Sequence, residues 1–434
     1  MTWHIVVQVG TADNFMPPLD AATPRLVASF ENPTHSAHVH NDVLRRVQET
    51  TGVLPQHDVI DVLHFAMAVY SADLRVNRNH ATDSWGRDFV LHLPVASPAR
   101  WMAGLPVLIR MLQFLTGDKW SIELRSRQAA PQPALTRILD DVQAIVLFSG
   151  GLDSLVGGID ALADGQKAAL VGHHGAGVTN SVQTDLLATL QQTYGDNVVP
   201  LMFYVQPPAS GAADGEKSMR SRSILFLALG IAVCETLGPD KTLVVAENGL
   251  ISLNVPLVPT RSGSSSTRTT HPHFILLCRE WIGSMGLTTS IDLPYRFKTK
   301  GEMLANCESP AVLRSTAANT MSCSHPESGR FQRHSPGNHC GYCVPCIIRR
   351  ASLHAAGLPQ TPYNVDIVRT PPPFATDTGR DLRAFQIALE RLRNVRPSKY
   401  LFDVMGTGPI PPAEARKYAD VYRRGMEEVR ALIG

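Results

Sequence analysis

The chain has 434 residues, of which 44% are hydrophobic and 18% are charged, and its formal net charge is +2. This length exceeds what one hydrophobic core usually supports, so we expect two or three domains. The small net charge gives no bulk electrostatic reason to expect direct nucleic-acid or membrane binding. The longest apolar run, Ile224–Cys234, is shorter than the ~20 residues that a membrane span requires. Because the N-terminus lacks the pattern of a secretory signal, a cytoplasmic location is expected.

The first 130 residues mix strand-like and helical hydrophobic patterns. They predict an N-terminal α+β accessory domain over residues 1–130, which is a candidate surface for docking a partner protein. It contains no catalytic motif that we recognise. The predicted strands are 4–9, 89–95 and 119–126, and the predicted helices are 59–74 and 101–115.

From residue 143 to residue 358, strand-like and helical segments alternate. This alternation predicts an α/β catalytic domain with a doubly wound parallel sheet, whose ligands bind beyond the carboxyl ends of the strands. The predicted strands are 143–148, 167–173, 197–205, 241–247 and 288–293, and the predicted helices are 153–163, 181–194, 221–237 and 271–285.

Three further segments complete the chain. Residues 359–434 combine Pro-rich connections with helical patterns and predict a helical C-terminal extension. Residues 206–218 and 261–269 are rich in small and polar residues. They are either plain surface loops or lids that close over a substrate.

The most informative motif is Ser149-Gly150-Gly151-Leu152-Asp153-Ser154, which directly follows an apolar strand pattern. Two glycines let the backbone turn sharply and bring its N–H groups close to an anion. The two serine hydroxyls and the start of the next helix add donors at the same place. The motif therefore predicts a phosphate-binding loop, although a Walker A sequence is absent. The alternative is a strand–helix turn that needs glycine for its shape alone.

A cysteine cluster lies near the end of the predicted catalytic domain. Cys340, Cys343 and Cys346 form two consecutive C-x₂-C steps, and Cys323 lies upstream. Four thiolates are the set that a closed, structural Zn²⁺ site requires. An Fe–S cluster, a redox-active C-x-x-C pair and free thiols are the alternatives.

The loop Ser149–Ser154 resembles the signature of the PP-loop ATP pyrophosphatases, which have the adenine nucleotide alpha hydrolase-like type of fold. These proteins cleave ATP between its α- and β-phosphates and adenylate an oxygen of the substrate. The resemblance implies that all six residues from Ser149 to Ser154 bind ATP. Asp153 would then serve Mg²⁺ or the geometry of the loop.

The loop and the cysteines together, in this order, resemble the QueC family of 7-cyano-7-deazaguanine synthases over residues 144–353. The resemblance implies catalytic roles for Asp153, for Arg222 in "RSRSILF" and for Lys300 in the Thr-Lys-x-Glu sequence. It also implies structural zinc at the four cysteines. The residues that it suggests for substrate binding are Glu247, Asn248, Gly249 and His173.

QueC enzymes adenylate the carboxylate of 7-carboxy-7-deazaguanine with ATP, and ammonia then attacks the activated acyl group. This chain differs from them in its N-terminal domain, its helical extension and its longer cysteine loop. In these features it resembles the QatC proteins, which are the QueC-like components of Qat anti-phage defence systems.

The resemblance implies an ATP-dependent ligase that uses ATP with Mg²⁺ and transfers a 7-deazaguanine-type acyl group to an amine. The expected acceptor is the N-terminus of a partner protein from the same defence system. One alternative is a nitrile synthase that uses ammonia. The second alternative is a non-catalytic ATP-binding subunit of a defence complex.

Overall fold

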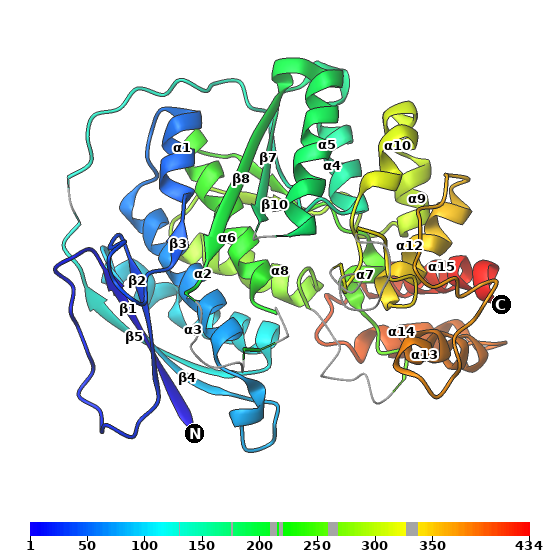
Figure 1. Ribbon diagram of the computed structural model, residues 1–434, viewed down its shortest axis with the longest axis horizontal. Helices are drawn as coiled ribbons and strands as arrows, with labels where there is room; N and C mark the ends of the chain where they lie inside the picture. Colours follow the sequence, from blue (N-terminus) through cyan, green and yellow to red (C-terminus); the bar gives the residue numbers. More distant parts are fainter. Residues whose placement is uncertain (130, 175–176, 209–214, 217–219, 259–267, 327–336) are drawn as a thin grey trace.

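Two β-sheets, with layers of helices packed between them and around them, organise the described part of the chain (Figure 1). In the computed structural model, the described residues are 1–129, 131–174, 177–208, 215–216, 220–258, 268–326 and 337–434. The two segments that we interpreted as surface loops or lids, 206–218 and 261–269, lie largely outside these ranges.

The N-terminal sheet has the strand order β2-β1-β4-β5, and every pairing in it is parallel. The α+β prediction for this region is therefore wrong. Helices cross over from β2 to β4 and from β4 to β5, and each crossover returns the chain in the same direction. The strands are β1 (Thr2–Val9), β2 (Arg25–Phe30), β4 (Asp88–Val95) and β5 (Lys119–Ser126), and the helices are α1 (Val43–Thr51), α2 (His57–Arg75) and α3 (Pro98–Thr116).

The second sheet has the order β10-β9-β6-β7-β8-β3. Its first five strands pair in parallel, whereas β3 comes from the N-terminal region and pairs antiparallel with β8. The expected α/β class with a parallel sheet is therefore confirmed. The strands are β3 (His40–Asn41), β6 (Ala144–Leu147), β7 (Ala168–His174), β8 (Val198–Gln206), β9 (Thr242–Val244) and β10 (Ser290–Asp292).

Two sets of helices cover the two faces of this sheet. One set shares a hydrophobic core with β6 and β7 and consists of α4, α5, α9 and α10. The other set, α6 and α8, packs against α2 and α3, so the helices of the N-terminal sheet cover this face. The bounds are α4 (Leu152–Leu162), α5 (Val178–Tyr194), α6 (Arg222–Leu237), α8 (Pro272–Ser284), α9 (Lys300–Ala305) and α10 (Pro310–Thr316).

The C-terminal residues form helices that pack on the edge of the catalytic region. The long amphipathic helix α15 contacts α7, α9, α12, α13 and α14, and all of these helices except α9 contribute to a third hydrophobic core. The bounds are α7 (Gly249–Leu253), α12 (Val344–Ala355), α13 (Asp377–Arg391), α14 (Pro397–Met405) and α15 (Ala415–Ile433). Among the residues that the structure describes, no helix has the length and apolar character needed to cross a membrane.

Candidate active site

The predicted site residues meet where the strand order of the second sheet reverses. From β6 the chain first builds β7 and β8 on one side, and it then returns to build β9 and β10 on the other side. The loop after β6 and the segment after β9 therefore leave neighbouring parallel strands at the same edge. In doubly wound sheets, ligands bind at this reversal, beyond the carboxyl ends of the strands. We call this place in the present sheet the crevice.

The loop after β6 has the backbone shape that the sequence predicted. Gly150 has a left-handed φ of 82°, and Gly151 is the N-cap of α4. A Cβ atom on Gly150 would lie 3.0 Å from Cγ of Gln183, so a side chain there meets both strain and crowding. Ser149 Oγ accepts a hydrogen bond from the Gly151 N–H at 3.3 Å, and Ser154 Oγ donates to the Gly151 carbonyl at 2.9 Å. The loop thus directs the N-terminus of α4, with its partial positive charge, into the crevice.

Asp153 contacts two of the other predicted residues. One of its carboxylate oxygens lies 2.7 Å from Lys300 Nζ. The other accepts hydrogen bonds from Asn248, at 2.7 Å from Nδ2 and 3.3 Å from the backbone N. Because Asn248 is fully buried and the Lys300 side chain is only 7% exposed, this contact is largely shielded from water. Asp153 therefore ties the loop after β6 to the segments that follow β9 and β10.

Local capping interactions hold the two partners of Asp153 in place. Asn248 Oδ1 accepts a hydrogen bond from the Ile251 N–H at 3.1 Å and caps α7. Lys300 is the first residue of α9, which begins with a capping box between Thr299 and Glu302. The cap residues Asn248 and Thr299 therefore fix the start of α7 and of α9 at the crevice.

Gly249 is required by close packing. Its N–H donates to the Lys298 carbonyl at 3.0 Å. A Cβ atom on Gly249 would lie 2.2 Å from the Arg296 carbonyl oxygen, so any side chain would separate the two segments.

Glu247 is a half-buried carboxyl group beside this cluster. Thr270 donates a hydrogen bond to Glu247 Oε2, and Thr270 Oγ1 lies 3.0 Å from Ser252 Oγ. Burial raises the pKa of Glu247 to about 7, and the negative charge of Asp153 acts in the same direction. A carboxyl group with this pKa can exchange a proton near neutral pH.

Arg222 lies at the carboxyl end of β7, because it opens α6 and its Nη2 donates to the His173 carbonyl at 3.4 Å. In the part of the chain that the structure describes, no carboxylate forms an ion pair with it. Burial lowers the pKa of this guanidinium. A half-buried cation without a carboxylate partner is suited to an anionic ligand.

His173 lies near the carboxyl end of β7, with its ring packed inside the protein. Its ring is buried, lies 3.1 Å from the Val205 carbonyl through Nε2, and stacks edge-on against Tyr70 and Phe226. Burial lowers its pKa to about 4, so the ring is neutral at physiological pH. Its backbone carbonyl, rather than its ring, contacts Arg222.

The predicted cysteines also come together. Cys340, Cys343 and Cys346 are buried side by side with Cys323, and Sγ of Cys340 lies 3.8 Å from Sγ of Cys346. Hydrogen bonds from the neighbouring thiols, with Cys323 first, hold the pKa of Cys343 well below its usual range. Sulfur atoms at 2.3 Å from a tetrahedral metal ion lie about 3.8 Å apart, so this spacing is compatible with zinc.

One donor of this cluster was not predicted from the sequence. The donor atoms of Cys323, His325, Cys340 and Cys343 lie within 4.8 Å of one another, so these residues can hold a metal ion. His325 lies only two positions after Cys323, and this proximity was the available signal. The metal centre therefore offers five donors, and His325 and Cys346 are the alternatives for the fourth position.

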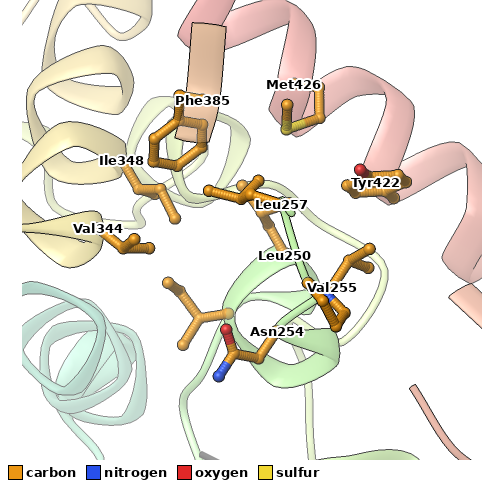
Figure 2. A pocket seen from close by; sticks show the side chains of 11 residues that line it. Leu250, Asn254, Val255, Leu257, Val344, Ile348, Phe385, Tyr422 and Met426 are labelled. Carbon is orange, nitrogen blue, oxygen red and sulfur yellow. The ribbon is translucent and has the colours of Figure 1, made fainter. Parts of the chain in front are cut away.

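A separate hollow is lined by α7, the segment that follows it, α12, α13 and α15 (Figure 2). Figure 2 shows that its lining is mainly apolar, with Leu250, Leu257, Ile348, Phe385 and Met426 among the side chains around it. It lacks the cations and the backbone cradle of the crevice, so it is not a candidate for a nucleotide.

A scan of protein-family models and a search of curated proteins found no match to this chain. The functional interpretation therefore depends on the geometry of the crevice and of the cysteine cluster, together with the motif resemblance of the loop.

Proposed function

We propose that this protein is a QueC-like, ATP-dependent carbon–nitrogen ligase. It adenylates a 7-carboxy-7-deazaguanine-type carboxylate and passes the acyl group to an amine, which is the N-terminus of a partner protein in anti-phage defence. The observation that carries the proposal is the position of the glycine loop at the strand-order reversal, where Asp153 holds Lys300 beside it. The PP-loop resemblance of the loop supplies the reaction type.

In the first half-reaction, a carboxylate oxygen of the substrate attacks the α-phosphorus of ATP, and pyrophosphate leaves. The backbone of the loop and the N-terminus of α4 would hold the departing pyrophosphate. Lys300 and Arg222 would neutralise the charge that develops on the phosphate oxygens. Mg²⁺ would be held mainly by phosphate oxygens, because both carboxylate oxygens of Asp153 already have protein partners.

In the second half-reaction, the amine nitrogen attacks the acyl carbon, and AMP leaves with the electron pair of the broken C–O bond. The nitrogen must then lose one proton. Glu247 is the group that we assign to accept it, because its pKa of about 7 leaves a basic fraction at neutral pH.

We assign structural zinc to the cysteine centre. Either choice of fourth ligand closes the coordination shell with protein donors and leaves no position for a substrate. Zinc would therefore stabilise the segments after α10 and would take no part in the acyl transfer.

The direct test is to incubate purified protein with ATP and 7-carboxy-7-deazaguanine and to measure AMP and pyrophosphate. The intact mass of a co-expressed partner protein then separates the outcomes. A mass increase on the partner supports protein conjugation. A free nitrile formed with ammonia would instead identify a nitrile synthase. ATP binding without any pyrophosphate release would identify a non-catalytic ATP-binding subunit and would overturn the proposal.

A further inference from the structure

Arg349 is an unusual residue because its guanidinium is fully buried and pairs with no carboxylate among the residues that the structure describes. Instead it donates to neutral oxygens: Thr320 Oγ1 at 2.7 Å, the Ala317 carbonyl at 2.7 Å and Ser322 Oγ at 3.3 Å. A buried cation without a counter-charge is costly, so an anionic group is expected nearby.

The cysteine centre is that group. Arg349 lies on α12 one turn after Cys346. Zn²⁺ with four thiolates carries a net charge of −2, and with three thiolates and a histidine a net charge of −1. In both cases a positive guanidinium next to the centre offsets part of this negative charge.

Ser322 connects the same centre to the glycine loop. It directly precedes Cys323, and its hydroxyl oxygen accepts hydrogen bonds from Arg349 and, at 3.2 Å, from the Leu152 N–H of the loop. The Ser322 N–H in turn donates to Nε2 of the buried His339, which directly precedes Cys340, at 3.2 Å. Ser322 and His339, which precede the predicted ligands Cys323 and Cys340, are therefore hydrogen-bonded to each other, and Ser322 is also hydrogen-bonded to the loop.

A second contact reinforces this connection. The Met321 N–H donates to the Gly150 carbonyl at 2.9 Å, and a Cβ atom on Gly151 would lie 3.6 Å from the Met321 carbonyl oxygen. The segment of chain that enters the metal centre thus lies against both glycines of the loop.

We propose that the metal centre sets the conformation of the Ser149–Ser154 loop through Ser322, with Arg349 as the positioning residue that holds the Ser322 hydroxyl. When the metal leaves, the thiolates take up protons and become neutral thiols, so the centre loses the negative charge that Arg349 offsets and the segment that carries Ser322 is freed. The loop then loses the acceptor of its Leu152 N–H and no longer keeps its shape for an anion. This inference goes beyond the proposed ligase function, because it concerns how the loop is held rather than what reacts there.

The first test uses hydrogen exchange of the peptide that contains residues 149–154, together with metal content and the affinity for ATP with Mg²⁺. Ser322→Ala should speed exchange in that peptide and weaken ATP binding, each about tenfold, while the metal stays bound. Ser324→Ala is the matched control, because this exposed serine lies on the other side of Cys323. It should leave both quantities at the wild-type level.

The second test uses Arg349→Lys and metal removal by chelation. Both should speed exchange at residues 149–154 more than at α8, which packs against α3 and β10. Wild-type exchange of the loop in Ser322→Ala protein, or in folded metal-free protein, would overturn the inference. The exchange measurement tests the link between the metal centre and the loop whether or not ATP binds. Absence of ATP binding by the wild type would instead count against the proposed function.

Discussion

The contact between Asp153 and Lys300 leads to the sharpest stability prediction. In Asp153→Asn the carboxylate becomes an amide of nearly the same shape, so packing is preserved while the counter-charge of Lys300 is lost. The side chains are 13% and 7% exposed, respectively, and their charged atoms are 2.7 Å apart. Exposed ion pairs contribute roughly 0.2–1 kcal/mol, whereas breaking a buried pair costs about 3–5 kcal/mol. Because this pair is nearly but not fully buried, we expect Asp153→Asn to lower the free energy of unfolding by about 3 kcal/mol.

A double-mutant cycle with Lys300→Met separates the ion pair from other effects. If the charge of Asp153 acts mainly on Lys300, then the double variant loses about 2–3 kcal/mol less than the sum of the two single variants. The assay is urea unfolding followed by circular dichroism at neutral pH. Asp185→Asn is the control, since this exposed carboxylate on α5 forms no ion pair in the described structure. A cost for Asp153→Asn no larger than that of Asp185→Asn, or additive single effects, would refute the assignment of this contact as the anchor of the site.

Three further predictions concern separate parts of the molecule. Because the pKa of Glu247 is about 7 in the folded protein against an ordinary 4.5, stability should fall as the pH rises from about 4.5 to about 7. Glu247→Gln should remove on the order of 1–2 kcal/mol of this fall, measured by urea unfolding at pH 5 and pH 8. Glu428→Ala in α15 removes the hydrogen-bond acceptor for Thr299, for the Gly301 N–H and for a serine of α12. It should lower the free energy of unfolding by about 2 kcal/mol. Glu427→Ala is the control, because this neighbouring side chain is exposed, and it should cost less than about 1 kcal/mol. Cys343→Ser should contain less bound metal than the wild type, as measured by elemental analysis. Wild-type metal content in that variant would contradict the assignment of Cys343 as a metal ligand.

The loop and its partners could be predicted because local sequence determines them. Glycines after an apolar strand, a Thr-x-x-Glu capping box before Lys300 and C-x₂-C steps each specify local geometry with few long-range contacts. The alternation of strands and helices likewise predicted the second sheet and its carboxyl edge. These local signals indicated the loop and the cysteine cluster, whereas Lys300 was assigned from the resemblance of its Thr-Lys-x-Glu sequence to the QueC family.

The sequence did not predict features that depend on packing between distant segments. β2 is a short strand that follows a long connection, and its parallel pairing with β1 depends on tertiary contacts. The position of α15 against α7 and α9 depends on matching surfaces far apart in the chain, so Glu428 had no local signal. Nothing in the sequence around Arg349 distinguishes it from an exposed arginine on a helix, because its burial depends on tertiary packing.

The most direct test of the central claim is ATP–pyrophosphate exchange in the presence of 7-carboxy-7-deazaguanine. The proposed function predicts exchange that requires both the protein and the carboxylate and that is lost in Asp153→Ala. Absence of exchange in metal-loaded wild-type protein, or undiminished exchange in Asp153→Ala, would contradict it.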